Sequence, residues 1–236
     1  MTDYKTKHYV FHCINNDVAE RDIQSIAKTQ EAAYTDITTT LDVKFDETIN
    51  YYLVNTPEEV AQMTGYDCPV NGLACFASNS VYAVYNDEVK CIGAHEDAHL
   101  ISDKFGISDS DFLSEGLAMH FDKCWWRVKN ELWCKYFLNE NLFVNPLDLL
   151  SSQKFYDCDC AITYPIAGAF TSFLIRKCGI DGYKRIYTAK SISDLKSSEP
   201  FSKELTALTN AFINEINAIT MTDDEKENIQ RIFQGK

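Results

Sequence analysis

The sequence predicts an α+β protein in which a small mixed sheet with helices is followed by a mainly helical C-terminal half. Short runs of β-forming residues alternate with helical stretches up to Asn86, and beyond Asn86 the apolar residues recur at helical spacing. Hydrophobic residues make up 45% of the 236 residues, enough to fill a sizeable core. Because no repeat or low-complexity linker interrupts the chain, we expect one domain over residues 1–236, with an α/β part at 1–104 and a helical part at 105–236.

Strands and helices are expected to alternate in the N-terminal part. Clusters of β-branched and aromatic residues predict strands near residues 8–11, 48–54, 73–76 and 81–85. Residues 17–41 carry apolar side chains along one side of a helix. A further helix is expected to begin at Thr56, because Thr56 can cap it and Pro57 fits the first helical position.

After Asn86 the chain is expected to stay helical. Helical spacing of apolar residues predicts helices over residues 88–104, 109–122, 124–138, 165–177, 181–189, 200–218 and 223–233. Thr222 and Glu225 form a capping box for the last of these helices. Pro165, expected at the first helical position, would place Tyr164 at the N-cap of its helix.

The chain is strongly acidic, with 35 Asp and Glu against 22 Lys and Arg and a net charge of −13. Nucleic-acid binders neutralise phosphates with basic surfaces, so this composition argues against DNA, RNA and anionic membrane surfaces as partners. The longest uncharged run, residues 160–175, falls short of the roughly 20 apolar residues that span a bilayer. No signal peptide is visible after Met1, so a cytoplasmic location is expected.

Nine cysteines cannot all pair with one another. Without an export signal, we expect reduced and mostly buried thiols. Cys158 and Cys160 could form half of a metal site, but no second pair stands at zinc-ribbon spacing. Reduced thiols are the simpler interpretation.

His95, Glu96 and His99 form the pattern His-Glu-x-x-His on a predicted helix. Residues four apart share a helix face, so the two imidazoles can converge on one zinc ion. The glutamate beside the first histidine can reach the water on that zinc and take its proton. At about 100° per residue, Asp97 falls on a solvated stripe with Lys90 and is expected to have no role.

A catalytic zinc usually has three protein ligands and keeps a fourth position for water. The candidate third ligand is Glu115, in the sequence Ser114-Glu115-Gly116-Leu117-Ala118 of the next predicted helix. Gly116 and Ala118 are small enough to let two helices approach closely, which would bring the Glu115 carboxylate to the zinc. The alternative is an ordinary acid in the first turns of a helix, where the helix dipole favours negative charge.

The two motifs together resemble the gluzincin metallopeptidases, and within them the small domains related to the aminopeptidase and thermolysin catalytic cores. The resemblance implies a zincin-like fold and one zinc ion per chain, held by His95, His99 and Glu115, with Glu96 as general base. It also implies that an edge strand of the N-terminal sheet, here residues 81–85, lies over the site. The implied architecture covers most of residues 45–190.

Residues 164–170 resemble the segment that carries a tyrosine beside the zinc in aminopeptidase-like gluzincins. The resemblance implies that the Tyr164 hydroxyl donates to the oxyanion of the tetrahedral intermediate. The alternative is a tyrosine whose ring packs in the core.

The sequence departs from the family in several places. Fifteen residues separate His99 from Glu115, fewer than is usual in the large families, so the connecting segment must be short. The Gly-x-Met-Glu-Asn segment that binds a free α-amine has no counterpart, because residues 72–76 contain no acid. This favours an endopeptidase or oligopeptidase over an aminopeptidase. The third histidine of the metzincins is also missing after His99.

The sequence therefore predicts a zinc-dependent hydrolase of peptide or protein substrates, with Glu96 and Tyr164 as catalytic residues. The alternative is a catalytically silent zinc-binding interaction module with a peptidase-like fold. The retained Glu96 argues against it, since a structural site usually fills all four positions with protein ligands. The sequence makes no prediction of the oligomeric state.

Several other side chains are possible neighbours of the site or bystanders. Candidate hydrogen-bond partners of the zinc ligands are Asp103, Asp111 and Asp122. The remaining histidines, expected to take no part, are His8, His12 and His120. An aromatic stripe around Trp125, Trp126 and Trp133 is expected to pack in the core, the alternative being a substrate cleft.

Overall fold

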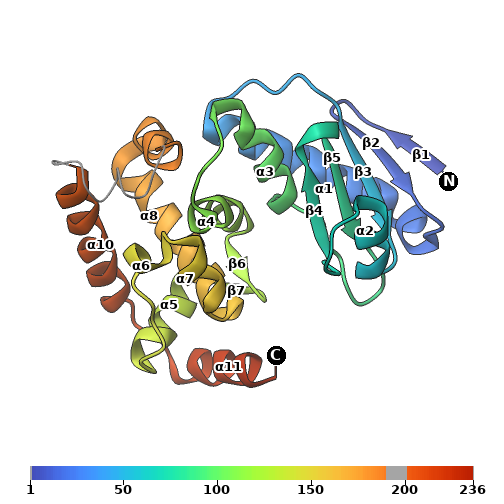
Figure 1. Ribbon diagram of the computed structural model, residues 1–236. Helices are drawn as coiled ribbons and strands as arrows, with labels where there is room; N and C mark the ends of the chain where they lie inside the picture. Colours follow the sequence, from blue (N-terminus) through green and yellow to red (C-terminus); the bar gives the residue numbers. More distant parts are fainter. Residues whose placement is uncertain (1, 190–200, 236) are drawn as a thin grey trace. The chain divides into compact units, whose positions relative to one another are not determined.

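The computed structural model describes residues 2–189 and 201–235 (Figure 1). The chain divides into two compact units, residues 1–105 and 106–236. The first unit holds a five-stranded mixed sheet with helices and the second is mainly helical, which confirms the predicted α+β class. That the two units form one domain stays a prediction. Position 200, the expected start of the helix over 200–218, lies outside the described residues.

The sheet of the first unit combines parallel and antiparallel strands (Figure 1). Its strands are β1 (Thr2–Lys5), β2 (Tyr9–Cys13), β3 (Ile49–Val54), β4 (Gly72–Cys75) and β5 (Ser80–Val84). They lie in the order β1-β2-β3-β5-β4, with β2, β3 and β5 parallel and the two outer strands antiparallel to their neighbours. The short polar strand β1 was not predicted.

The sheet ends at β4, so the expectation that residues 81–85 form an edge strand over the site is wrong. Strand β4 folds back on β5 through the 3-10 turn Phe76–Ser78. As a result β5 is paired on both sides, with β3 on one side and β4 on the other. Sequence pattern alone cannot distinguish the inner strand of such a pair from the outer one, because both are short and apolar.

Two helices cover opposite faces of the sheet. Helix α1 (Asp17–Leu41) packs on the face that carries Tyr9, whose hydroxyl oxygen lies 3.1 Å from the Gln30 carbonyl oxygen. Helix α2 (Pro57–Thr64) places Val60 against the other face, at Val54 and Val84. Both helices begin where the sequence predicted, and Thr56 caps α2 by accepting from the Glu59 amide at 3.3 Å.

Helix α3 (His95–Ser102) is shorter than the predicted helix over residues 88–104. The segment before α3 is extended, because the Cys91 amide donates to the Val84 carbonyl at 2.8 Å and Tyr85 pairs with Lys90. Gly93 has a φ of 127°, in the left-handed region, which no helix residue adopts. The helix therefore starts at the first histidine of the motif and is followed by the 3-10 turn Asp103–Phe105.

The second unit is built from helices and one small hairpin. Its elements are α4 (Asp111–Asp122), β6 (Cys124–Trp125), β7 (Val128–Lys129), α5 (Asn130–Asn139), α6 (Pro146–Leu149), α7 (Ser152–Asp157), α8 (Cys160–Tyr187), α10 (Phe201–Asn217) and α11 (Asp223–Gln234). The predicted capping box at Thr222 and Glu225 is confirmed at the start of α11. Gly179, with a φ of 70°, breaks α8 between the two helices predicted over 165–177 and 181–189.

Two predictions in this unit are wrong. Residues 124–129 form the β6–β7 hairpin, so the helix expected over 124–138 begins only at Asn130. Helix α8 begins at Cys160, because Asp159 caps it by accepting from the Ala161 amide at 2.9 Å. Pro165 therefore lies inside α8, and Tyr164 is a helical residue rather than an N-cap.

The core of the second unit is rich in aromatic side chains. Trp133 is fully buried and stacks on Phe137 with ring centroids 5.6 Å apart, as the aromatic stripe predicted. Trp126 departs from that prediction, since it is 40% exposed at the tip of the β6–β7 hairpin. Within the described part of the chain, no helix combines the length and apolar character needed to cross a membrane.

Candidate metal centre

The motif helix α3 presents its two histidines side by side. The His95 and His99 rings meet edge to face, with centroids 5.2 Å apart. Both side chains are partly buried, so they remain reachable from solvent. This is the arrangement expected when residues four apart occupy one face of a helix.

Asp97 is fully buried, so the expectation of a solvated side chain is wrong. That expectation placed Asp97 on one helical stripe with Lys90, but the helix begins only at His95. The Asp97 Oδ2 atom accepts hydrogen bonds from the Tyr9 hydroxyl at 2.5 Å and from Gln30 Nε2 at 3.0 Å. Burial raises the pKa of the Asp97 carboxyl to about 8, although these two hydrogen bonds oppose the shift.

The Glu96 carboxylate lies against the first residue of the edge strand β4. A Cβ atom at Gly72 would stand 2.5 Å from Glu96 Oε1 and 2.7 Å from Cys91 Sγ, closer than side-chain atoms tolerate. Because Gly72 pairs with Ala83, a side chain at position 72 would lie on the face of the sheet that α1 covers. Position 72 therefore requires a glycine for as long as Glu96 keeps this orientation.

Glu115 lies in the second turn of α4, partly buried. The next residue, Gly116, is the point of close approach to another helix, but that helix is α8 rather than the motif helix. A Cβ atom at Gly116 would stand 2.5 Å from Thr171 Oγ1 and 2.8 Å from the Ala167 carbonyl oxygen. Gly116 thus sets the close packing of α4 on α8, so the expectation that it lets α4 approach the motif helix is wrong.

This packing brings Tyr164 of α8 beside Glu115. Burial and the Glu115 carboxylate, which accepts a hydrogen bond from the Tyr164 hydroxyl, raise the pKa of Tyr164 well above its usual value. The Tyr164 ring lies between Phe155 and Trp125, with centroids 5.6 Å and 5.4 Å away. Tyr164 thus combines a packed ring with a hydroxyl directed at a candidate metal ligand.

His95, His99 and Glu115 could hold a metal ion. One ligand atom from each residue can be chosen so that all lie within 4.8 Å of one another. Two imidazole nitrogens and one carboxylate oxygen suit Zn²⁺, which accepts both kinds of ligand. Among residues 2–189 and 201–235 no other group of three or more His, Cys, Asp or Glu side chains is arranged in this way. Cys158 and Cys160 therefore belong to no such group.

Three aspartates were candidate hydrogen-bond partners of the metal ligands. Asp103 is exposed in the turn after α3, whereas Asp111 and Asp122 are partly buried at the two ends of α4. Their role as partners of the metal ligands stays a prediction.

All nine cysteines are free thiols, but only Cys13 and Cys134 are buried, so the expectation of mostly buried thiols is wrong.

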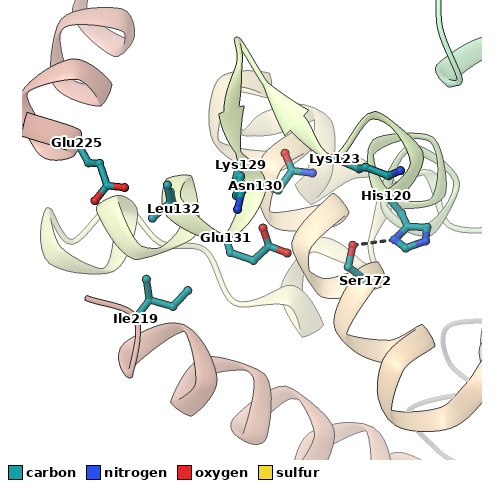
Figure 2. Close-up of a pocket in the computed structure, with 9 residues that line it drawn as sticks. All are labelled: His120, Lys123, Lys129, Asn130, Glu131, Leu132, Ser172, Ile219 and Glu225. Atoms are coloured by element: carbon teal, nitrogen blue, oxygen red, sulfur yellow. Dashed lines mark hydrogen bonds between the residues drawn. The ribbon is translucent and has the colours of Figure 1, made fainter. Parts of the chain in front are cut away.

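His120 lines a separate cavity of about 570 Å³ in the second unit. Figure 2 shows its ring turned towards Ser172, with Nδ1 and Oγ 2.8 Å apart. The Ser172 hydroxyl donates to the Gly168 carbonyl at 2.8 Å, so His120 Nδ1 is the donor in this pair. Lys123, Lys129 and two glutamates also line this cavity, and none of the candidate metal ligands does. His120 is thus engaged apart from the metal group, as its helical position indicated.

Three residues around the motif were not found from the sequence. Tyr9 and Gln30 contact Asp97, and Gly72 contacts Glu96, yet each lies more than 20 residues from the motif. No local pattern marks such residues, because their role depends on strand pairing and helix packing. For Gln30 alone a signal was available, because this glutamine interrupts the apolar face of the helix over residues 17–41.

No family model matches this sequence, and no characterised protein matches it in a sequence search.

Proposed function

We propose that this chain is a zinc-dependent peptide-bond hydrolase. The observation that carries the proposal is the group His95, His99 and Glu115, accompanied by Glu96 beside the first histidine. A set of two histidines and one glutamate is typical of catalytic zinc in thermolysin-like and carboxypeptidase-like enzymes, and leaves one coordination position for water. A purely structural zinc site would need a fourth protein ligand.

Zinc, when bound, would polarise the scissile carbonyl and lower the pKa of the attacking water to about 7. Glu96 would take the proton of that water on its carboxylate and pass it to the leaving amine nitrogen. The Tyr164 hydroxyl would donate a hydrogen bond to the carbonyl oxygen as negative charge develops there, in place of its hydrogen bond to Glu115. The position of Tyr164 beside Glu115 supports this role.

An extended peptide substrate would pair antiparallel with β4, the strand at which the sheet ends. Main-chain hydrogen bonds of this kind bind a peptide largely without regard to its sequence. The proximity of Gly72 to Glu96 supports this placement, because a peptide beside β4 would lie close to the general base. No acid in residues 72–76 is present to bind a free α-amine, so cleavage within peptides is favoured over removal of single N-terminal residues.

Metal analysis combined with a peptide assay tests the proposal. We expect the purified chain to bind one zinc per chain and to cleave internal bonds of a mixed peptide pool. A chelator should stop cleavage and added zinc should restore it. Replacing Glu115 with alanine should weaken zinc binding by more than the roughly 10–100-fold that loss of an outer-shell partner costs. Zinc binding without any cleavage would instead support the silent interaction module, and absence of zinc would refute both.

Replacing Gly72 with alanine should lower kcat while zinc content and fold are retained. The added methyl group would overlap both Glu96 Oε1 and Cys91 Sγ, and the flexible Glu96 side chain would move away from it. A displacement of about 1 Å at a reacting group can cost about 100-fold in rate. Ala74→Ser, which also adds one heavy atom to β4, is the matched control and should keep wild-type turnover. Equal turnover in Gly72→Ala and the wild type would show that Glu96 does not act from this position.

A further inference from the structure

A buried polar network in the first unit joins three elements. It consists of Tyr9 on β2, Gln30 on α1 and Asp97 on α3, each with 0% of its surface exposed. Helices α1 and α3 pack side by side within this unit (Figure 1). Polar groups in a core cost free energy unless they are hydrogen-bonded, and Asp97 Oδ1 has no partner among the described residues. Because burying these polar groups costs free energy, we expect the network to fix the position of the elements that it joins.

Gln30 holds the backbone that enters the motif helix. Its Nε2 donates to the Gly93 carbonyl at 2.9 Å, and its Oε1 accepts from the Gly93 amide at 2.8 Å. Helix α3 has no side-chain cap of its own, so this pair of bonds anchors the chain two residues before His95. The left-handed φ of Gly93 makes the anchored conformation one that other residues adopt only with strain.

Asp97 holds the helix itself. Its Oδ2 receives hydrogen bonds from Tyr9 on the sheet and from Gln30 on α1. Asp97 lies two residues after His95 and two before His99, so at about 100° per residue it faces away from both histidines. Bonds at this position restrict rotation of α3 about its axis, and that rotation decides where the two imidazoles point.

We infer that Tyr9, Gln30 and Asp97 are positioning residues that hold His95 and His99 in the orientation needed to bind a metal ion. The inference deepens the proposed function and rests on metal binding by these histidines. A site held rigid by outer contacts binds metal more tightly, because its ligands need not be reordered when the ion enters. None of the three side chains has to touch the metal or the substrate.

Two tyrosine variants of the full chain test this inference. Tyr9→Phe removes the hydroxyl that reaches Asp97. Tyr34→Phe is the matched control, because Tyr34 is also buried in this unit and donates its hydroxyl to the Phe45 carbonyl, away from α3. Zinc affinity is measured by competition with a chelating dye, and thermal unfolding of the metal-free variants is followed by circular dichroism. Cobalt substitution adds an absorbance spectrum that reports the geometry of the ligands.

Both variants are expected to unfold at a lowered temperature, since each loses a buried hydroxyl group that donates a hydrogen bond. Only Tyr9→Phe should weaken zinc binding, by up to about 10-fold, because Tyr9 contacts Asp97 rather than a ligand and should matter less than a direct outer-shell partner. Its cobalt spectrum should also differ from that of the wild type. Tyr34→Phe should keep the wild-type Kd and spectrum.

Wild-type zinc affinity in Tyr9→Phe would overturn the inference, and so would an equal loss of affinity in both variants. If Tyr9→Phe does not fold, Gln30→Met replaces it, since methionine fills similar volume without the bonds to Gly93 and Asp97. A wild-type chain that binds zinc but cleaves no peptide would refute the proposed hydrolase and leave the positioning role to be decided by the variants. A wild-type chain that binds no zinc would refute both.

Discussion

Replacing Glu96 with glutamine is expected to lower kcat by about 10²–10⁴-fold, the usual contribution of a general base. Glutamine has nearly the same shape as glutamate, but its amide cannot accept a proton from water. Zinc content should be unchanged, because the proposed ligands are His95, His99 and Glu115. The measurement is zinc content and turnover of a cleaved peptide, with both proteins loaded to the same metal level.

Glu88→Gln is the control for this substitution, since it makes the same chemical change at an exposed residue of the same unit. It should retain full activity. If Glu96→Gln cleaves peptides as fast as the wild type, the proposed proton transfer is excluded. If it also loses its zinc, Glu96 is part of the metal site rather than a base beside it.

Replacing Tyr164 with phenylalanine is expected to lower kcat by about 10²–10³-fold, the cost of removing one hydrogen-bond donor to an oxyanion. The ring contacts with Phe155 and Trp125 do not involve the hydroxyl, so phenylalanine should keep them. KM should change less than kcat, because the donor acts on charge that develops only in the transition state. Steady-state kinetics on one cleaved peptide give both constants.

Tyr183→Phe provides a control within the same helix α8. The Tyr183 hydroxyl donates to the Leu113 carbonyl at 3.3 Å and is fully buried, so its removal should lower stability without lowering kcat. An equal loss of kcat in both variants would trace the effect to the packing of α8. Unchanged kcat in Tyr164→Phe would leave Tyr164 as a core residue, the alternative that its sequence position also allowed.

Local features of the sequence determined much of the secondary structure. Helix α2 begins after Thr56, and the capping box at Thr222 starts α11, because a cap needs only residues within one turn of each other. The two histidines of the motif share a face for the same local reason. Helix α8 shows the limit of such local signals. Pro165 predicted a helix start at that residue, but α8 is capped by Asp159 and begins at Cys160.

Long-range contacts decided which of these elements meet. The motifs identified His95, His99 and Glu115 as candidate ligands, but helical spacing gave the wrong surroundings for Asp97 and the family resemblance implied the wrong edge strand. Which strand ends the sheet depends on the pairing of β4 with β5, and the burial of Asp97 depends on α1 packing against α3. Backbone hydrogen bonds within a helix are specified by neighbours in the chain, whereas a position in the core is specified by side chains that only folding brings together. For this reason the sequence alone could identify the candidate ligands. Only the tertiary structure showed that Gln30 and Tyr9 hydrogen-bond Asp97 of the same helix, and that Gly72 lies beside Glu96.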